Sequence, residues 1–186
     1  MSVEESEGSA AEGSGSGLRI RDLLEDTLSL APDAFEERHG SAFLLMSAAE
    51  LKQASGPRPT QVRGLPGSAS DRTAHLRLMV YPVVRTERSI FPFVTVGRTQ
   101  NNDIVFPEVT ISRFHAFFKS DDDGGFSLQD AGSTNGTHVN NQPVPAQRKG
   151  SPIRLKSGDN LRFGAVEVTF LSSQALREFI LEFDVG

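Results

Sequence analysis

The feature that most constrains the fold is a two-residue alternation of apolar and polar side chains, which begins after about residue 74. The apolar members of its first and last runs are Leu76, Leu78, Val80, Val166, Val168 and Phe170. Successive side chains of a strand point to opposite faces, so this period predicts strands with one buried face. Turn-forming pairs such as Asn101-Asn102 and Asn135-Gly136 separate the runs. Many short strands with turns about every ten residues predict an all-β sandwich or barrel.

Composition excludes several classes of function. The chain of 186 residues has a formal net charge of −5, which argues against general nucleic-acid binding because that binding uses Lys and Arg to neutralise phosphates. There is no cysteine, so disulfides and cysteine-ligated metals are excluded. No metal-ligand spacing is found among the four histidines, which are His39, His75, His115 and His138. We therefore expect no metal and no cofactor.

The location of the protein is predicted from what its apolar residues do not form. The first residues are acidic and lack the apolar core of a signal peptide. No stretch approaches the roughly 20 apolar residues that a membrane helix needs. We expect a cytoplasmic protein without a membrane partner.

Composition and spacing divide the chain into five segments. Residues 1–17 are mainly Ser, Glu, Gly and Ala and are expected to be a disordered tail, since they have little apolar surface to bury. Residues 18–54 are expected to form a small, mainly helical extension, because apolar residues recur there at helical spacing. Residues 55–73 are rich in Pro, Gly and Ser and predict a linker. The β-domain is assigned to residues 74–172, and residues 173–186 predict an amphipathic C-terminal helix.

Most of the conspicuous polar residues of the β region lie at its turns, where a rigid scaffold can hold a binding site. Arg98 and Arg113 have planar, permanently charged guanidinium groups that suit phosphate oxygens. Ser112 and Thr134 supply hydroxyl donors, and the amide of Asn135 can bind a peptide backbone. These groups are sufficient to bind a phosphorylated side chain if the three loops that carry them meet.

Five short motifs follow one another in this region. They are Gly97-Arg98, Asn102-Asp103-Ile104, Ser112-Arg113-x-His115-Ala116, Asp130-x-Gly132-Ser133-Thr134-Asn135-Gly136-Thr137 and Leu155-x-x-Gly158-Asp159-x-x-x-Phe163-Gly164. In this order they resemble a forkhead-associated (FHA) domain, over about residues 74–172. The resemblance implies an all-β, two-sheet sandwich of about eleven strands that binds phosphothreonine through loops at one end. A short C-terminal helix and a partly helical, partly disordered N-terminal extension would flank it.

The resemblance also implies a role for each matching residue. Those expected to bind the phosphate are Arg98, Ser112, Arg113 and Thr134. Those expected to bind the peptide backbone are Asn135 and Asn140. Those expected to shape the loops are Gly97, His115, Gly132 and Gly136. The pair Asn140-Asn141 departs from the Asn-Gly that is frequent in the family, although Asn tolerates the left-handed conformation of such a turn.

Two alternative functions are considered. Ser112, His115 and Asp130 are the residue types of a hydrolytic triad, but no nucleophile-elbow or oxyanion-hole sequence accompanies them. The acidic run 121–123 is better explained as a hairpin turn than as a metal site. The main rival is a phosphate-independent scaffold with the same fold, which would not need the phosphate-binding set. The prediction is therefore a non-enzymatic module that binds a phosphothreonine-containing protein, the substrate of a Ser/Thr kinase, in signalling or assembly.

Overall fold

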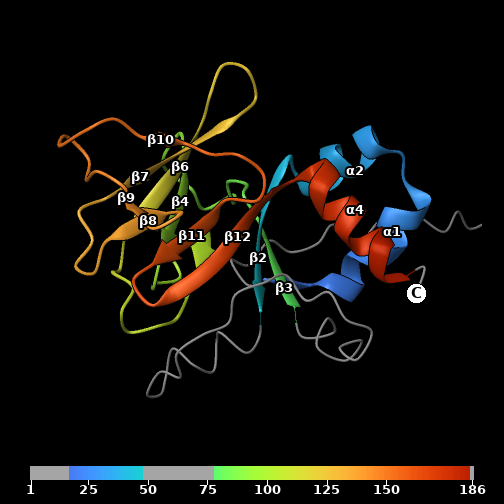
Figure 1. Ribbon diagram of the computed structural model, residues 1–186, viewed down its shortest axis with the longest axis horizontal. Helices are drawn as coiled ribbons and strands as arrows, with labels where there is room; N and C mark the ends of the chain where they lie inside the picture. The colour runs from blue at the N-terminus through green and yellow to red at the C-terminus, as the bar shows by residue number, and fades with distance from the viewer. Residues whose placement is uncertain (1–16, 48–77, 185–186) are drawn as a thin grey trace, which may run out of the picture.

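The computed structural model describes residues 17–47 and 78–184 (Figure 1). The expected disordered tail, the linker and residues 48–54 and 74–77 lie outside the described residues, except for Gly17. Within them the chain forms two sheets with twelve strands, so the predicted two-sheet sandwich is confirmed. The predicted number of about eleven strands differs by one.

The larger sheet has the strand order β1-β3-β2-β12-β11-β8-β9. Its strands are β1 (Leu18–Arg19), β2 (Ala42–Ser47), β3 (Leu78–Pro82), β8 (Thr137–Val139), β9 (Gln142–Pro143), β11 (Asn160–Phe163) and β12 (Val166–Ser172). The smaller sheet has the order β10-β7-β6-β4-β5. Its strands are β4 (Val94–Gly97), β5 (Ile104–Val105), β6 (Ala116–Ser120), β7 (Phe126–Asp130) and β10 (Ile153–Arg154). The pairing is antiparallel except between β4 and β5.

The main hydrophobic core lies between the inner faces of the two sheets. Its fully buried members include Leu44, Val96, Phe118, Leu128, Leu161 and Phe163. Strand β12 shows how the period of two produces this core, because Val166, Val168 and Phe170 are buried while Glu167 between them is exposed. The alternation in the sequence therefore marks the buried face correctly.

A second hydrophobic core lies on the outer face of β2 and β3. It is covered by three helices, α1 (Leu24–Ser29), α2 (Pro32–His39) and α4 (Ser173–Asp184), and a 3-10 helix, η1 (Ile20–Leu23), leads into α1. Figure 1 shows these helices together on one side of β2 and β3, away from β4, β6 and β7. Strand β2 contributes to both cores, since Leu44 faces the sandwich and Phe43 faces the helices.

The extension was expected to be mainly helical, and the structure adds two strands to it. Strand β2 lies between β3 and β12, and β1 pairs with β3 at the edge of the same sheet. The run from Ala42 to Met46 is apolar on both faces, so its period could not distinguish a doubly buried strand from a buried helix. The larger sheet therefore begins well before residue 74.

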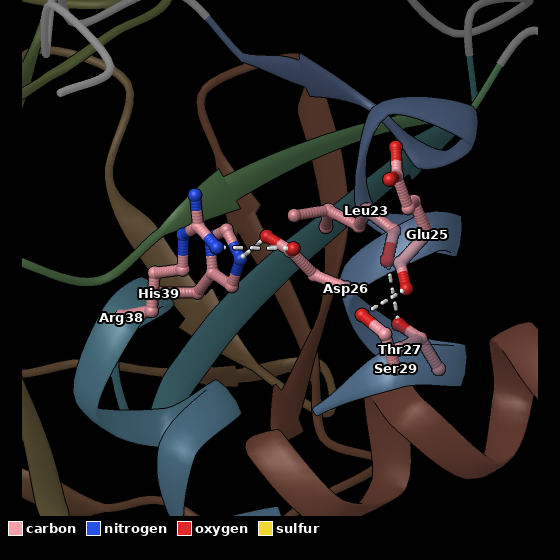
Figure 2. Close-up of polar contacts among 7 residues, drawn as sticks. All are labelled: Leu23, Glu25, Asp26, Thr27, Ser29, Arg38 and His39. Carbon is pink, nitrogen blue, oxygen red and sulfur yellow. Dashed lines mark hydrogen bonds and ion pairs between the residues drawn. The ribbon is translucent and has the colours of Figure 1, made fainter. Parts of the chain in front are cut away.

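Polar contacts join α1 to α2. The carboxylate of Asp26 contacts Nε2 of His39 at 2.6 Å and accepts a hydrogen bond from Nη1 of Arg38 at 3.2 Å (Figure 2). On α1 itself the hydroxyls of Thr27 and Ser29 donate to backbone carbonyls one turn back, each at 2.7 Å. The contacts of Asp26 therefore link α1 to α2 within the helical layer.

Candidate functional site

Strand register brings three loops together at one end of the strands of the smaller sheet. Val96 near the end of β4 pairs with Ala116 at the start of β6, and Ala116 also pairs with Asp130 at the end of β7. The loop after β4, the loop before β6 and the loop from β7 to β8 must therefore lie next to one another. These are the loops that carry the predicted phosphate-binding residues.

Ser112 is the point at which the three loops are joined. Its carbonyl oxygen accepts a hydrogen bond from the backbone N–H of Arg98 at 3.0 Å. Its hydroxyl oxygen accepts one from the backbone N–H of Thr134 at 3.1 Å, and the two hydroxyl oxygens are 3.5 Å apart. The structure thus places the backbones of Arg98, Ser112 and Thr134 side by side, in three loops that are far apart in sequence.

The turn after β4 has room only for glycine at position 97. A β-carbon on Gly97 would overlap the carbonyl oxygen of Arg113 and lie 2.6 Å from Nδ2 of Asn102. That amide nitrogen donates to the carbonyl of Arg113 at 2.7 Å and to the carbonyl of Thr99 at 2.8 Å. Asn102 belongs to one of the five motifs, but no role could be assigned to it from the sequence. The structure shows that it joins the loop after β4 to the loop before β6.

His115 joins the loop before β6 to the loop from β7 to β8. It is fully buried; its Nδ1 accepts a hydrogen bond from the backbone N–H of Ser112 at 3.0 Å, so Nε2 carries the proton and donates to the carbonyl of Gly136 at 3.2 Å. Burial lowers the pKa of His115, although the bond to Gly136 and the charge of Asp130 raise it in part. A neutral ring is the form that satisfies both partners.

Asp130 organises the loop from β7 to β8. Its carboxylate accepts hydrogen bonds from the backbone N–H groups of Gly132 and Ser133 at 2.7 and 2.9 Å, and from the hydroxyls of Ser133 and Thr137 at 2.6 and 2.7 Å. Burial alone would raise the pKa of Asp130, but these four bonds together hold it below its ordinary value. The carboxylate therefore serves the loop as a fixed acceptor.

These contacts are not those of a hydrolytic triad. The ring of His115 bonds to the backbone of Ser112, whose hydroxyl oxygen instead accepts from Thr134. The carboxylate of Asp130 is occupied by its own loop. Among the described residues, the Ser-His-Asp chain of hydrogen bonds that a triad requires is not formed.

The remaining predicted residues fall into two groups. Gly132 and Gly136 have φ of +87° and +76°, a region that favours glycine, and they shape the loop that holds Asn135. Asn135 is exposed, and its Nδ2 donates to the carbonyl of Thr110 at 2.7 Å. Asn140 lies at the opposite end of β8.

Asn140 is not brought to the three loops. With φ of 49° at Asn140 and 68° at Asn141, these residues form the turn between β8 and β9. The side-chain amide of Asn140 donates to Asp159 at 2.8 Å and accepts from the backbone N–H of Asn160 at 2.9 Å. These contacts support a structural role at the turn, and the contact of Asn140 with a peptide backbone stays a prediction.

Two exposed cations, Arg98 and Arg113, stand at this end of the smaller sheet although the chain as a whole is acidic. Arg98 and Arg113 are both exposed, and within residues 17–47 and 78–184 neither guanidinium has a carboxylate within 4.0 Å. Two carboxylates near these loops are already engaged, since Asp130 binds its own loop and Asp103 binds the threonines of β4 and the loop before it. An anion that reached the loops would meet two exposed guanidinium groups.

Membrane-spanning helices and metal-binding clusters are both absent from the described residues. None of their helices combines the length and apolar character needed to cross a membrane. In the same part of the chain, no group of three or more His, Cys, Asp or Glu side chains could hold a metal ion.

Comparison with known proteins agrees with this geometry. Residues 94–164 match the family model of the FHA domain, and this range contains all three loops. This segment of the chain is an FHA domain, and the family predicted from the five motifs is confirmed.

Two relatives illustrate the family. The oxoglutarate dehydrogenase inhibitor of Corynebacterium glutamicum is 38% identical over 84 residues, which cover 45% of this chain and 54% of the inhibitor. The glycogen accumulation regulator GarA of Mycolicibacterium smegmatis is 37% identical over 81 residues, which cover 44% of this chain and 47% of GarA. The matched region thus spans about half the length of each relative. A solved FHA domain from a study of phosphothreonine-dependent interactions aligns with a TM-score of 0.43 and 23% identity, covering 70% of this chain and 96% of its own.

Proposed function

We propose that this protein binds phosphothreonine-containing segments of partner proteins through the loops that meet at Ser112, and that it performs no catalysis. The observation that carries the proposal is the junction itself: Ser112, with its hydroxyl, and Arg98, which is exposed and has no carboxylate partner among the described residues, are joined by a backbone hydrogen bond. A phosphorylated threonine carries about −1.5 to −2 charges and three acceptor oxygens. Cations and hydroxyls in adjacent loops are the groups that such a ligand requires.

Each residue has a distinct part in the proposed complex. Arg98 and Arg113 supply charge-assisted hydrogen bonds to the phosphate, and the hydroxyls of Ser112 and Thr134 bind its remaining oxygens. Asn135 holds the peptide backbone beside the phosphothreonine. Three or four such bonds at about 1.5–3 kcal/mol each, less the cost of association, correspond to roughly micromolar affinity.

The proposal includes a cellular setting. The partner is the substrate of a Ser/Thr kinase, both act in the cytoplasm, and neither nucleic acid nor membrane is bound. The names of the relatives, an inhibitor of one enzyme and a regulator of glycogen accumulation, support a regulatory role through protein binding rather than a catalytic one.

The experiment is a titration of the protein with a degenerate phosphothreonine peptide library and with the same library unphosphorylated. Only the phosphorylated library should bind. Arg98→Ala should weaken that binding by at least about tenfold, because a charge-assisted pair is lost. Arg21→Ala is the matched control, since it removes the same charge from an exposed position on η1 and should leave affinity unchanged.

Three results would contradict the proposal. Equal binding of both libraries would favour the phosphate-independent scaffold. Unchanged affinity in a folded Arg98→Ala variant would remove Arg98 from the site. Turnover of an ester substrate would show catalysis instead.

A further inference from the structure

An aromatic patch lies on the outer face of the smaller sheet, and we define it as Phe91, Phe93, Phe114 and Phe117. Phe117 points away from the main core, because its neighbours on β6, Ala116 and Phe118, face inward. It is nonetheless fully buried, since the other rings cover it: the centroid of Phe93 lies 4.4 Å from that of Phe117, and the centroid of Phe114 lies 6.0 Å from it.

The covering layer is itself left open to solvent. The ring of Phe91 stacks on Phe93 at 5.0 Å and on Phe114 at 6.0 Å, with interplanar angles of 10° and 5°. Yet Phe91 and Phe114 remain 42% and 37% exposed, and the adjoining Ile90 is 86% exposed. The need to bury Phe117 accounts for the rings that pack directly on it. It does not account for the additional apolar side chains that face water. Contiguous exposed apolar surface of this kind is typical of interaction sites.

The patch is continuous with the proposed phosphate site. Phe114 directly follows Arg113 and lies two residues after Ser112, so its Cα is at most about 7 Å from that of Ser112. A peptide anchored by its phosphate at Ser112 would therefore have neighbouring side chains within reach of Phe114 and, through the stack, of Phe91.

Charge selects the class of occupant. The rim of the patch is cationic: Arg113 is exposed beside Phe114, and Nζ of Lys119 lies 5.5 Å from the ring centroid of Phe117. An occupant that is both apolar and negatively charged fits this combination.

We propose that the aromatic patch is a second contact surface for the phosphothreonine-bearing partner, where Phe91 and Phe114 bind an aliphatic or aromatic side chain that flanks the phosphothreonine. This inference rests on the proposed function. The binding site would then have two parts. The loops recognise the phosphate, and the outer face of the smaller sheet selects among phosphorylated sequences.

The test uses the full chain and phosphothreonine peptides in which each flanking position in turn is Leu, Phe or Ser. At one flanking position the wild-type protein should bind the Leu or Phe peptide about tenfold more tightly than the Ser peptide, because apolar surface becomes buried. Phe91→Ser should abolish this preference while leaving the affinity for the all-Ser phosphopeptide unchanged. Leu28→Ser is the control, since it removes a 57% exposed apolar residue from α1 in the helical layer.

The outcomes separate this inference from the proposed function. Phosphopeptide binding without any apolar preference, or with a preference that survives in folded Phe91→Ser, would overturn the second surface and leave the phosphate site standing. No binding of any phosphopeptide would overturn both. A concentration-dependent dimer in sedimentation that Phe91→Ser abolishes would assign the patch to self-association instead. Thermal unfolding of each variant shows that it is folded.

Discussion

Removal of the His115 ring should uncouple the loops that carry the phosphate-binding residues. In the wild-type protein the buried ring accepts from the N–H of Ser112 and donates to the carbonyl of Gly136. His115→Ala deletes both partners at once. It leaves a donor in one loop and an acceptor in another without their partner, at a position that water reaches poorly.

The size of the effect follows from these two groups. A buried polar group without a partner costs about 1–3 kcal/mol, so the pair costs about 2–6 kcal/mol, and the cavity left by the ring adds to this. A domain of ordinary stability has a free energy of unfolding of about 5–15 kcal/mol. His115→Ala should therefore lose a large part of the free energy of unfolding and remain only marginally folded at 25 °C.

Two further variants divide the effect between the loops. The amide of His115→Asn reaches about as far as Nδ1 and can accept from Ser112, whereas the amide of His115→Gln reaches about as far as Nε2 and can donate to Gly136. Each should recover about half of the stability lost in His115→Ala, as measured by urea unfolding. Of the two, His115→Asn should keep more phosphopeptide affinity, because the bond that it preserves positions Ser112.

Two results would contradict the role assigned to His115. An Ala variant within about 1 kcal/mol of the wild type would mean that these bonds contribute little. Equal phosphopeptide affinity for all three variants, each folded, would mean that His115 does not position the loops.

Three other predictions can be tested with the same assays. Gly97→Ala should destabilise the domain by about 1–3 kcal/mol or more and weaken phosphopeptide binding, since its β-carbon overlaps the backbone of Arg113; Gly124→Ala, which has open space but φ of +80°, should cost only backbone strain and leave binding unchanged. As pH falls below about 6.5, stability should decline until the lowered pKa of His115 is reached, because the unfolded chain takes up the proton first; urea midpoints should lose this part of their slope in His115→Gln. Asp103→Ala removes a carboxylate that accepts five hydrogen bonds from β4 and the loop before it, and calorimetry should show a loss of at least about 3 kcal/mol.

The sandwich could be predicted because its information is local. The period of two in β12 identifies its buried face without any knowledge of its partner, and turn residues mark where each strand stops. Strand β2 lacked such a signal. Its residues are apolar on both faces because helices cover one side and the sandwich the other, and this depends on α4, more than 120 residues away in sequence.

The site could be predicted in content but only partly in geometry. Arg98, Ser112 and Thr134 are recognisable from residue type and motif order, but their convergence depends on the register of β4, β6 and β7, which no local pattern specifies. The position of Asn140 relative to these loops is likewise not specified by its motif. Its motif position suggested a ligand contact, and only the register of β8 shows that it lies at the other end of that strand.

The structure assigns different work to the two kinds of polar residue in these loops. The buried ones, Asp130 and His115, have their hydrogen-bonding capacity taken up within the protein, so they hold the loops in place before any ligand arrives. The exposed ones, such as Arg98, have no acidic partner among the described residues. A loop that is already ordered loses little entropy on binding, so a few phosphate contacts can yield useful affinity. A change in the buried group therefore affects binding through the order of the loops, and a change in the exposed group affects it through lost contacts.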